Sequence, residues 1–183
     1  MDIPVKTRTT FAEYAALPES NQIVELIDGE IVVNPPLFRH QKALVKVIFS
    51  LQFVSDNGEI CVAPSGLKFD DGNSFEPDLF WVSKENTNCV LGSDGRYWYG
   101  GPDLVVEVLS PSTEANDRGH KFQTYQKYGV LEYWMVNPEA KFVEVYHLES
   151  QRLMQQGVYD AGQPFVSAVL RGVTIDTRTW FSE

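Results

Sequence analysis

The sequence predicts an α/β fold, organised as a single domain over residues 1–183, because stretches with helical and strand patterns alternate along it. Two observations carry this prediction. In the first half, a helical pattern after residue 36 leads into a block of short strands. In the second half, an apolar run at 104–109 precedes a helical pattern and then another strand-like run. A chain of 183 residues can bury a substantial core without disulfides.

The N-terminal elements are predicted by local signals. Thr10 precedes Glu13 by three residues, which is a capping-box pattern, and predicts a short helix that ends before residue 18. Two β-rich runs, 23–27 and 30–33, surround the dipeptide Asp28-Gly29, which favours a two-residue hairpin turn. We therefore expect an N-terminal β-hairpin.

The central elements follow from periodicity and turn residues. We expect Pro35-Pro36 to end the hairpin, and the apolar spacing from Leu44 to Val54 predicts the longest helix, up to residues 56–58. A loop is expected over 84–101. Short strands separated by Pro, Gly, Asp and Asn are predicted around 59–63, 66–70 and 75–83.

The C-terminal half contains a strand, a helix and then further strands. The run 104–109 predicts a strand buried on both faces, and a helix from about 114 to Tyr128, with Gly129 at its C′ position, should follow. The remaining expected elements are strands at 132–136 and 142–146, a turn at Asn137-Pro138, and strands over 151–183 with turns at Gly157 and Gly162.

Glu107 is the most informative residue, because it is a carboxylate inside the run Leu104 to Leu109. An unpaired charge in such a strand costs about several kcal/mol. Asp78 lies in a second apolar run, 75–82, and repeats the pattern. Two carboxylates in buried strands indicate a metal site.

Asp103 is the competing partner for Glu107, since Pro-Asp-Leu occurs at 77–79 and at 102–104. Asp103 and Glu107 are separated by roughly 13 Å along one strand at about 3.3 Å per residue, too far to share an ion. Asp78 belongs to a separate strand that can pair beside the Glu107 strand, so we select Asp78. Asp103 is interpreted as a turn residue at the strand entry.

Several segments together form a recognisable family pattern: ELIDGEIV, EPDLFWV, GPDLVVEVLSPST at 101–113, YGVLEYWMVNP at 128–138, and the spaced Asp117, Lys121 and Tyr125. Through these segments the chain resembles the PD-(D/E)xK nuclease superfamily, and within it the family of restriction endonucleases called domain of unknown function 820. The resemblance implies a restriction-endonuclease-like core, a central mixed β-sheet flanked by helices. It also implies an endonuclease that hydrolyses DNA with Mg²⁺ or Mn²⁺, with Asp78 and Glu107 as metal ligands, and a homodimer.

The chain departs from the superfamily pattern at Leu109, where a Lys usually follows the strand Glu by two residues. Lys121 resembles the family's Lys in the next helix, on one face with Asp117 and Tyr125. It either positions the water and stabilises the transition state, or it is an exposed Lys paired with Asp117.

Secondary positions leave alternatives open. His40 either binds near the metal or hydrogen-bonds within the core. One of Glu25 and Glu30, which flank the hairpin turn, either adds a metal ligand at the site or faces solvent. The aromatic segment 97–99 either stacks on bases or covers the core.

Arg39, Lys42 and Lys46 form a basic stripe on the long helix, which either contacts nucleic acid or is simply solvated. The net charge of −10 excludes a protein that coats nucleic acid without specificity, although it permits a local basic groove. Leu109 and this acidic balance motivate the alternative of a catalytically inactive nuclease-fold module that binds nucleic acid or protein.

The location follows from cysteine usage and hydropathy. Cys61 and Cys89 form no CxxC pair and suit a reducing compartment. The first twenty residues lack the apolar core of a signal peptide, and no apolar stretch is long enough to cross a bilayer. We therefore expect a cytoplasmic protein without a membrane segment.

Overall fold

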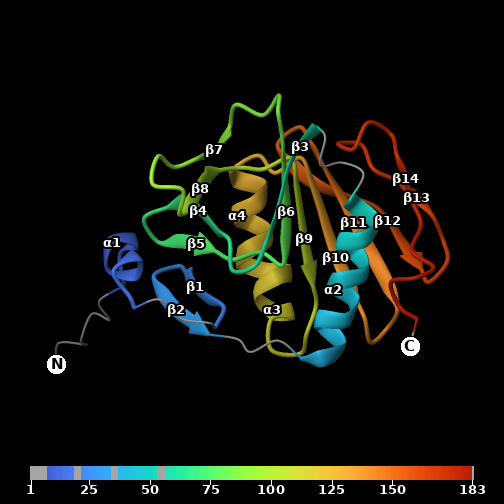
Figure 1. Cartoon of the computed structure of the whole chain (residues 1–183), viewed down its shortest axis with the longest axis horizontal. Coiled ribbons are helices and arrows are strands. Elements are labelled where there is room, and N and C mark those ends of the chain that lie inside the picture. The colour runs from blue at the N-terminus through green and yellow to red at the C-terminus, as the bar shows by residue number, and fades with distance from the viewer. Residues whose placement is uncertain (1–7, 19–21, 34–36, 53–56, 183) are drawn as a thin grey trace.

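A central six-stranded mixed sheet contains Glu107, with strand order β12-β11-β10-β9-β6-β3 (Figure 1). The computed structural model describes residues 8–18, 22–33, 37–52 and 57–182. Strand β9 runs parallel to β10 and antiparallel to β6. The bounds are β3 Gly58–Val62, β6 Leu79–Ser83, β9 Leu104–Val108, β10 Glu132–Asn137, β11 Phe142–Glu149 and β12 Arg152–Asp160.

A second six-stranded sheet contains the N-terminal hairpin and has the order β2-β1-β5-β4-β8-β7. It is also mixed, because β4 and β8 are parallel. Its strands are β1 Val24–Ile27, β2 Glu30–Val33, β4 Gly66–Asp70, β5 Asn73–Phe75, β7 Cys89–Leu91 and β8 Tyr97–Gly100, and a separate two-stranded sheet pairs β13 Phe165–Val166 with β14 Thr174–Ile175.

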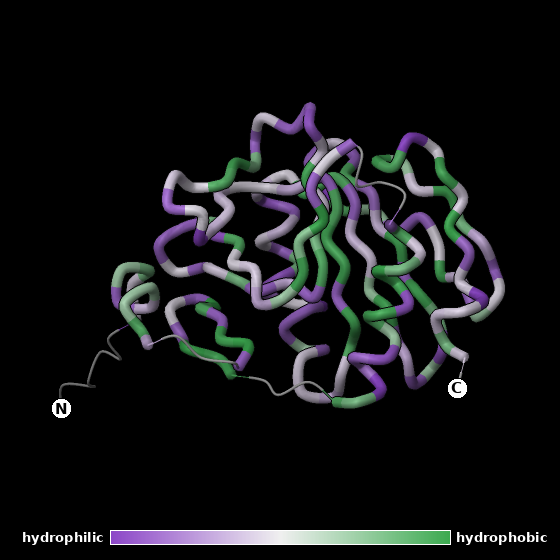
Figure 2. Tube along the Cα trace, viewed as in Figure 1, coloured by the Kyte–Doolittle hydropathy of each residue, from purple (hydrophilic) through white to green (hydrophobic). Residues whose placement is uncertain are grey.

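Helices cover the two faces of the central sheet. Helix α2, Phe38–Leu51, packs with Val106 and Val108 in one apolar cluster. On the other face, α4, Phe122–Lys127, packs through Tyr125 with Val105 and Leu109. The remaining helices are α1 Phe11–Ala15, α3 Glu114–Asn116 and the π-helical turn Asp117–Lys121 between α3 and α4. The apolar residues are concentrated along the central strands between these layers (Figure 2).

The predicted local signals at the N-terminus are confirmed. Thr10 and Glu13 form a reciprocal capping box at the start of α1. Asp28 and Gly29 both have positive φ, 48° and 75°, as a type I′ hairpin turn requires, and they join β1 to β2. The expected end of the hairpin at Pro35-Pro36 lies outside the described residues. The longest helix ends at Leu51 and Gly58 already begins β3, so the helix is shorter than the prediction, which extended it to residues 56–58.

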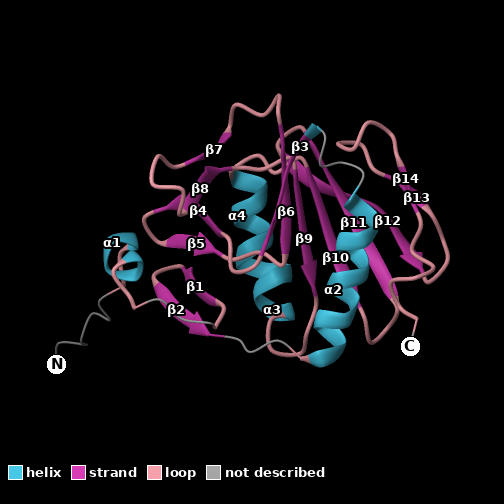
Figure 3. Cartoon of the chain, viewed as in Figure 1, coloured by secondary structure: helices cyan, strands magenta, loops and turns pink. Residues whose placement is uncertain are grey.

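Three predictions of elements were wrong (Figure 3). The expected strand 75–83 is divided, because Pro77 has no N–H for a ladder and the chain passes there from β5 of one sheet to β6 of the other. The expected loop 84–101 contains the strands β7 and β8. Gly157 lies within β12, at a register shift opposite Val145, rather than in a turn.

Candidate active site

Glu107 and Asp78 approach each other through the pairing of β6 with β9. The last paired residues are Leu79 and Val106, so the same antiparallel register places Asp78 opposite Glu107. Asp78 therefore lies just before β6 rather than inside a strand. Its backbone N–H lies 3.4 Å from Oε2 of Glu107. The two carboxylates come from sequence positions that are 29 residues apart and line one cavity.

The partner of Glu107 is the buried ammonium of Lys121. Lys121 Nζ donates to Glu107 Oε1 at 3.0 Å and lies 2.9 Å from Glu25 Oε1 and 3.4 Å from Asp117 Oδ1. The Tyr125 hydroxyl donates to the same Glu107 oxygen at 2.6 Å. Lys121 is only 3% exposed, so the alternative of an exposed lysine was wrong, although the pairing with Asp117 that it included is found.

Charge pairing controls protonation in this cluster. Burial alone lowers the pKa of Lys121, but the nearby carboxylates of Glu107, Glu25 and Asp117 outweigh it and raise the pKa well above its usual range. Burial raises the pKa of Glu107 against the opposing effect of Lys121. Burial and then Glu107 raise the pKa of Tyr125, so its phenol keeps the proton that it donates.

Asp78 is held by two donors. Its Oδ2 accepts from the backbone N–H of Val108 at 2.7 Å, and its Oδ1 lies 2.8 Å from His40 Nε2. Burial lowers the pKa of His40, but the hydrogen bond to Asp78 and the negative charges of Asp78 and Asp117 together outweigh it, and the net shift is upward. His40 is thus a buried partner of Asp78 from α2, which joins the site to the helix on the opposite face of the sheet.

The acidic cavity, as we call the space around Lys121, has a volume of about 30 Å³, which is room for roughly one or two water-sized particles. Its walls include five carboxylates and one ammonium. Asp117 Oδ1 is buried and has no hydrogen-bond partner, and burial raises the pKa of that carboxyl. The lining residues are Ile23, Glu25, His40, Glu76, Asp78, Glu107, Ser110, Thr113, Asp117 and Lys121.

Two further carboxylates line the acidic cavity: Glu25, which the sequence analysis named with Glu30 as alternatives, and Glu76, which it did not name. Glu25 is 3% exposed and accepts from the Glu76 backbone N–H at 3.0 Å, while Glu76 accepts from the Val24 N–H at 3.0 Å. Burial raises the pKa of Glu76 to about 7. Glu25 lies inside the apolar run 23–27, the same pattern that identified Glu107, so its burial could have been predicted.

Other predicted positions lie away from the acidic cavity. Glu30 is exposed at the start of β2 and does not line the cavity, so its selection as a secondary site residue was wrong; Glu25 is the inward residue of the hairpin. Asp103 accepts from the backbone N–H of Ser83 at 2.8 Å, as expected for a turn residue. Leu109 packs in the apolar cluster with Tyr125.

The basic stripe of α2 lies near the protein surface and is partly engaged. Arg39 pairs with Glu139 at 3.4 Å, and Lys46 donates to the backbone carbonyl and hydroxyl of Ser182. Arg39 and Lys42 line a shallow depression near the C-terminal segment. In the aromatic segment, Tyr97 packs edge-on against Phe11 at 5.1 Å between ring centroids, which supports packing rather than base stacking.

The donor set of the acidic cavity fits a hard divalent cation. Carboxylate oxygens are the ligands that Mg²⁺ prefers, and five carboxylates line the cavity with one lysine; the Asp117 Oδ1 among them accepts no hydrogen bond. In the described part of the chain, no three His, Cys, Asp or Glu side chains already form a group that could hold a metal. Mg²⁺ commonly uses one or two carboxylates plus water and substrate oxygens, so a closed protein cage is not required.

Fold and site together define a mixed α/β protein of the restriction-endonuclease-like class, with a buried acidic and lysine-containing centre. The chain belongs to the Uma2 family, also called domain of unknown function 820, whose model is described as "Putative restriction endonuclease" and matches residues 11–178. Within the described residues, none of the helices combines the length and apolarity needed to cross a membrane.

Two similar proteins are known, and the solved structure among them supports the fold. A crystal structure described as a putative nuclease of this family, from Anabaena variabilis, has a TM-score of 0.76 at 20% identity and covers 94% of this chain and 97% of that one. An uncharacterized protein of Synechocystis sp. (strain ATCC 27184 / PCC 6803 / Kazusa) is 51% identical over 47 residues. That match spans 25% of each chain, so it is confined to one segment.

Proposed function

We propose that this protein is a divalent-metal-dependent endonuclease that hydrolyses DNA phosphodiester bonds. The observation that carries the proposal is the buried Lys121 ammonium, which lies 3.0 Å from Glu107 in a cavity that Asp78 also lines. Burying a lysine ammonium destabilises the fold unless carboxylates pair with it. Residues with strongly shifted pKa values are concentrated at functional sites. Membership of a restriction endonuclease family favours the same chemistry.

Asp78 and Glu107 would hold the metal ion, and Asp117, whose buried Oδ1 accepts no hydrogen bond and lies 3.4 Å from Lys121 Nζ, lines the same cavity. When bound, a Mg²⁺ or Mn²⁺ ion polarises the phosphoryl oxygen and lowers the pKa of a coordinated water. The metal would also balance the excess of carboxylates over ammonium in the cavity.

The protein side chains prepare this site. Lys121 and Tyr125 both donate to Glu107 Oε1, which fixes the orientation of that carboxylate. Lys121 stays protonated, so its ammonium can stabilise charge that develops on the phosphate. The His40 ring and the Val108 N–H hold Asp78 in place. Lys121 thus supplies from the helix the cation that Leu109 does not supply from the strand.

Conversion of supercoiled plasmid to nicked and linear forms in Mg²⁺ or Mn²⁺ tests the proposal. We expect cleavage by the wild type, none in EDTA, and a loss of at least about 100-fold in Glu107→Gln. Glu59→Gln is the matched control, because Glu59 is exposed on β3 and outside the cavity. Cleavage that survives in Glu107→Gln, or no metal-dependent cleavage by the wild type, contradicts the proposal.

The second candidate function is a nuclease-fold module that binds nucleic acid or protein without cleaving. Leu109 and the direct pairing of Lys121 with Glu25 and Glu107 favour it, because these ion pairs satisfy the cluster without a metal. DNA binding that is unaffected by divalent metal, together with an absence of nicking, identifies this alternative.

We also propose that two copies pair, because cutting both strands of a duplex needs two sites and each chain offers one acidic cavity. Size-exclusion chromatography with light scattering should give the mass of a dimer, and a monomer at all concentrations contradicts this part.

The free thiols Cys61 and Cys89 favour a reducing compartment, the cytoplasm.

A further inference from the structure

A second cavity opens beside the acidic one and shares part of its wall. This vestibule has a volume of about 160 Å³ and lies between the start of α2, the segment after β9 and the turn between β10 and β11. His40 and Ser110 line both the vestibule and the acidic cavity. A group that occupies the vestibule is therefore next to whatever occupies the acidic cavity.

The size and walls of the vestibule fit one planar ring. A cavity of about 150 Å³ is large enough for a benzene-sized molecule. Five apolar side chains line the vestibule, Leu37, Leu109, Pro111, Pro138 and Ala140. Apolar walls with a few polar groups are typical of sites that bind a planar ligand by stacking.

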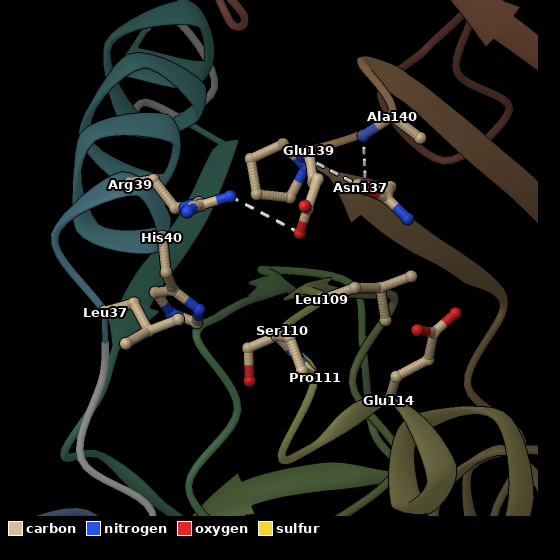
Figure 4. A pocket seen from close by; sticks show the side chains of 11 residues that line it. Leu37, Arg39, His40, Leu109, Ser110, Pro111, Glu114, Asn137, Glu139 and Ala140 are labelled. Atoms are coloured by element: carbon tan, nitrogen blue, oxygen red, sulfur yellow. Dashed lines mark hydrogen bonds and ion pairs between the residues drawn. The ribbon is translucent and has the colours of Figure 1, made fainter.

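The charged groups of the vestibule are mutually neutralised. Arg39 from α2 and Glu139 from the β10–β11 turn reach toward each other across it, at 3.4 Å (Figure 4). Both side chains are more than half exposed, so this ion pair is weak and can open. The carboxylate of Glu114 is paired with Arg118 at 2.7 Å. The carboxylates of Glu114 and Glu139 are therefore both paired, so a DNA strand that approaches the vestibule meets no unpaired carboxylate among these residues.

We propose that the vestibule is a nucleobase subsite, which receives one unpaired or extrahelical base while the adjoining phosphate lies at the mouth of the acidic cavity. This inference rests on the proposed function and makes it more specific. The substrate class is DNA with an unpaired nucleotide at the cleavage position, because a base paired within a duplex cannot enter a pocket of this kind. The cost of unstacking is smallest for a base that is already unpaired.

The test compares two labelled DNA duplexes, one fully paired and one with a single unpaired 2-aminopurine. Binding is measured in EDTA by fluorescence anisotropy, which separates recognition from cleavage. We expect the wild type to bind the duplex with the unpaired base about tenfold more tightly, as stacking of one base allows. The 2-aminopurine emission should change on binding, because the base leaves the DNA stack.

Filling the vestibule should remove this preference. Ala140 is exposed on the vestibule rim, and its N–H donates to Asn137 Oδ1 independently of the side chain. Ala140→Trp should lose the preference and keep its affinity for the paired duplex. Leu37→Trp is a second filling variant at an exposed position, and Ala12→Trp on α1, outside the vestibule, is the matched control.

Equal binding of the two duplexes by the wild type, or a preference that survives in both filling variants, overturns the subsite. Nicking of both duplexes at equal rates in Mg²⁺ also overturns it and leaves the nuclease function in place. A preference for the unpaired base that both filling variants lose, without any cleavage in metal, supports the subsite and overturns the nuclease function.

Discussion

The substitution Lys121→Met tests the electrostatic organisation of the site, because methionine has a similar length but no charge. In the wild type, Lys121 Nζ lies 3.0 Å from Glu107, 2.9 Å from Glu25 and 3.4 Å from Asp117. A pair of unit charges at about 3 Å gains roughly 5 kcal/mol at an effective dielectric constant of about 20. The substitution removes these attractions and leaves the carboxylates buried.

The net cost is smaller than the sum of the attractions, because the ammonium no longer has to be desolvated. Breaking a buried ion pair by removing one partner costs about 3–5 kcal/mol, and we expect a loss of this size in the free energy of unfolding. Without Lys121, the pKa of Glu107 rises further, so the folded state binds more protons than the unfolded state near neutral pH. Stability then falls as the pH increases, and the loss should be larger at pH 8 than at pH 6.

Urea unfolding followed by tryptophan fluorescence measures this difference. Lys127→Met is the matched control, since Lys127 is 67% exposed on α4 and should change stability by less than about 1 kcal/mol. The double variant Lys121→Met with Glu107→Gln should recover part of the loss, because both charged partners are then removed. A loss below about 1 kcal/mol for Lys121→Met at both pH values refutes the reasoning.

Three further predictions concern single interactions. Tyr125→Phe removes the 2.6 Å hydrogen bond to Glu107 and should cost about 2 kcal/mol in urea unfolding; an unchanged midpoint contradicts it. Burial raises the pKa of Glu144, but hydrogen bonds from Arg118 and Tyr146 outweigh it and lower the pKa, so Glu144→Gln should destabilise the protein at pH 7. The difference in stability between Glu144→Gln and the wild type should vanish as the pH falls through the folded-state pKa of Glu144. A difference that does not change with pH excludes this explanation. Thr10→Ala removes the N-cap of α1 and should lower the free energy of unfolding by about 1 kcal/mol, measured by thermal unfolding. An unchanged unfolding temperature contradicts this prediction and indicates that the cap is not formed in solution.

The parts of the fold that the sequence predicts are those set by short-range signals. The capping box at Thr10, the Asp28-Gly29 turn and the left-handed Gly129 after α4 each depend on neighbouring residues alone, and each is found. The apolar run of β9 also predicts its burial on both faces. The division of 75–83 between two sheets depends on which strand each half pairs with, which periodicity does not encode.

The site could be predicted only in part for the same reason. A carboxylate in an apolar strand identifies Glu107, and the distance along one strand excludes Asp103 as its partner. The spacing of Asp117, Lys121 and Tyr125 predicts one shared helical face, and the three side chains do meet around Glu107. Whether that face points inward depends on how the helix packs on the sheet, which the spacing does not encode. Between the alternatives Glu25 and Glu30, Glu25 is the buried one because consecutive residues of β1 are buried, whereas β2 is largely exposed; the sequence pattern of the two strands does not show this difference.

Metal binding to the acidic cavity tests the central claim most directly. Titration calorimetry with Mn²⁺ should show binding to the wild type that is lost in Asp78→Asn and in Glu107→Gln, with circular dichroism showing that both variants remain folded. The control Glu59→Gln should bind Mn²⁺ as the wild type does. Absence of binding to the wild type, or equal binding by all four proteins, contradicts the assignment of this cavity as a metal centre.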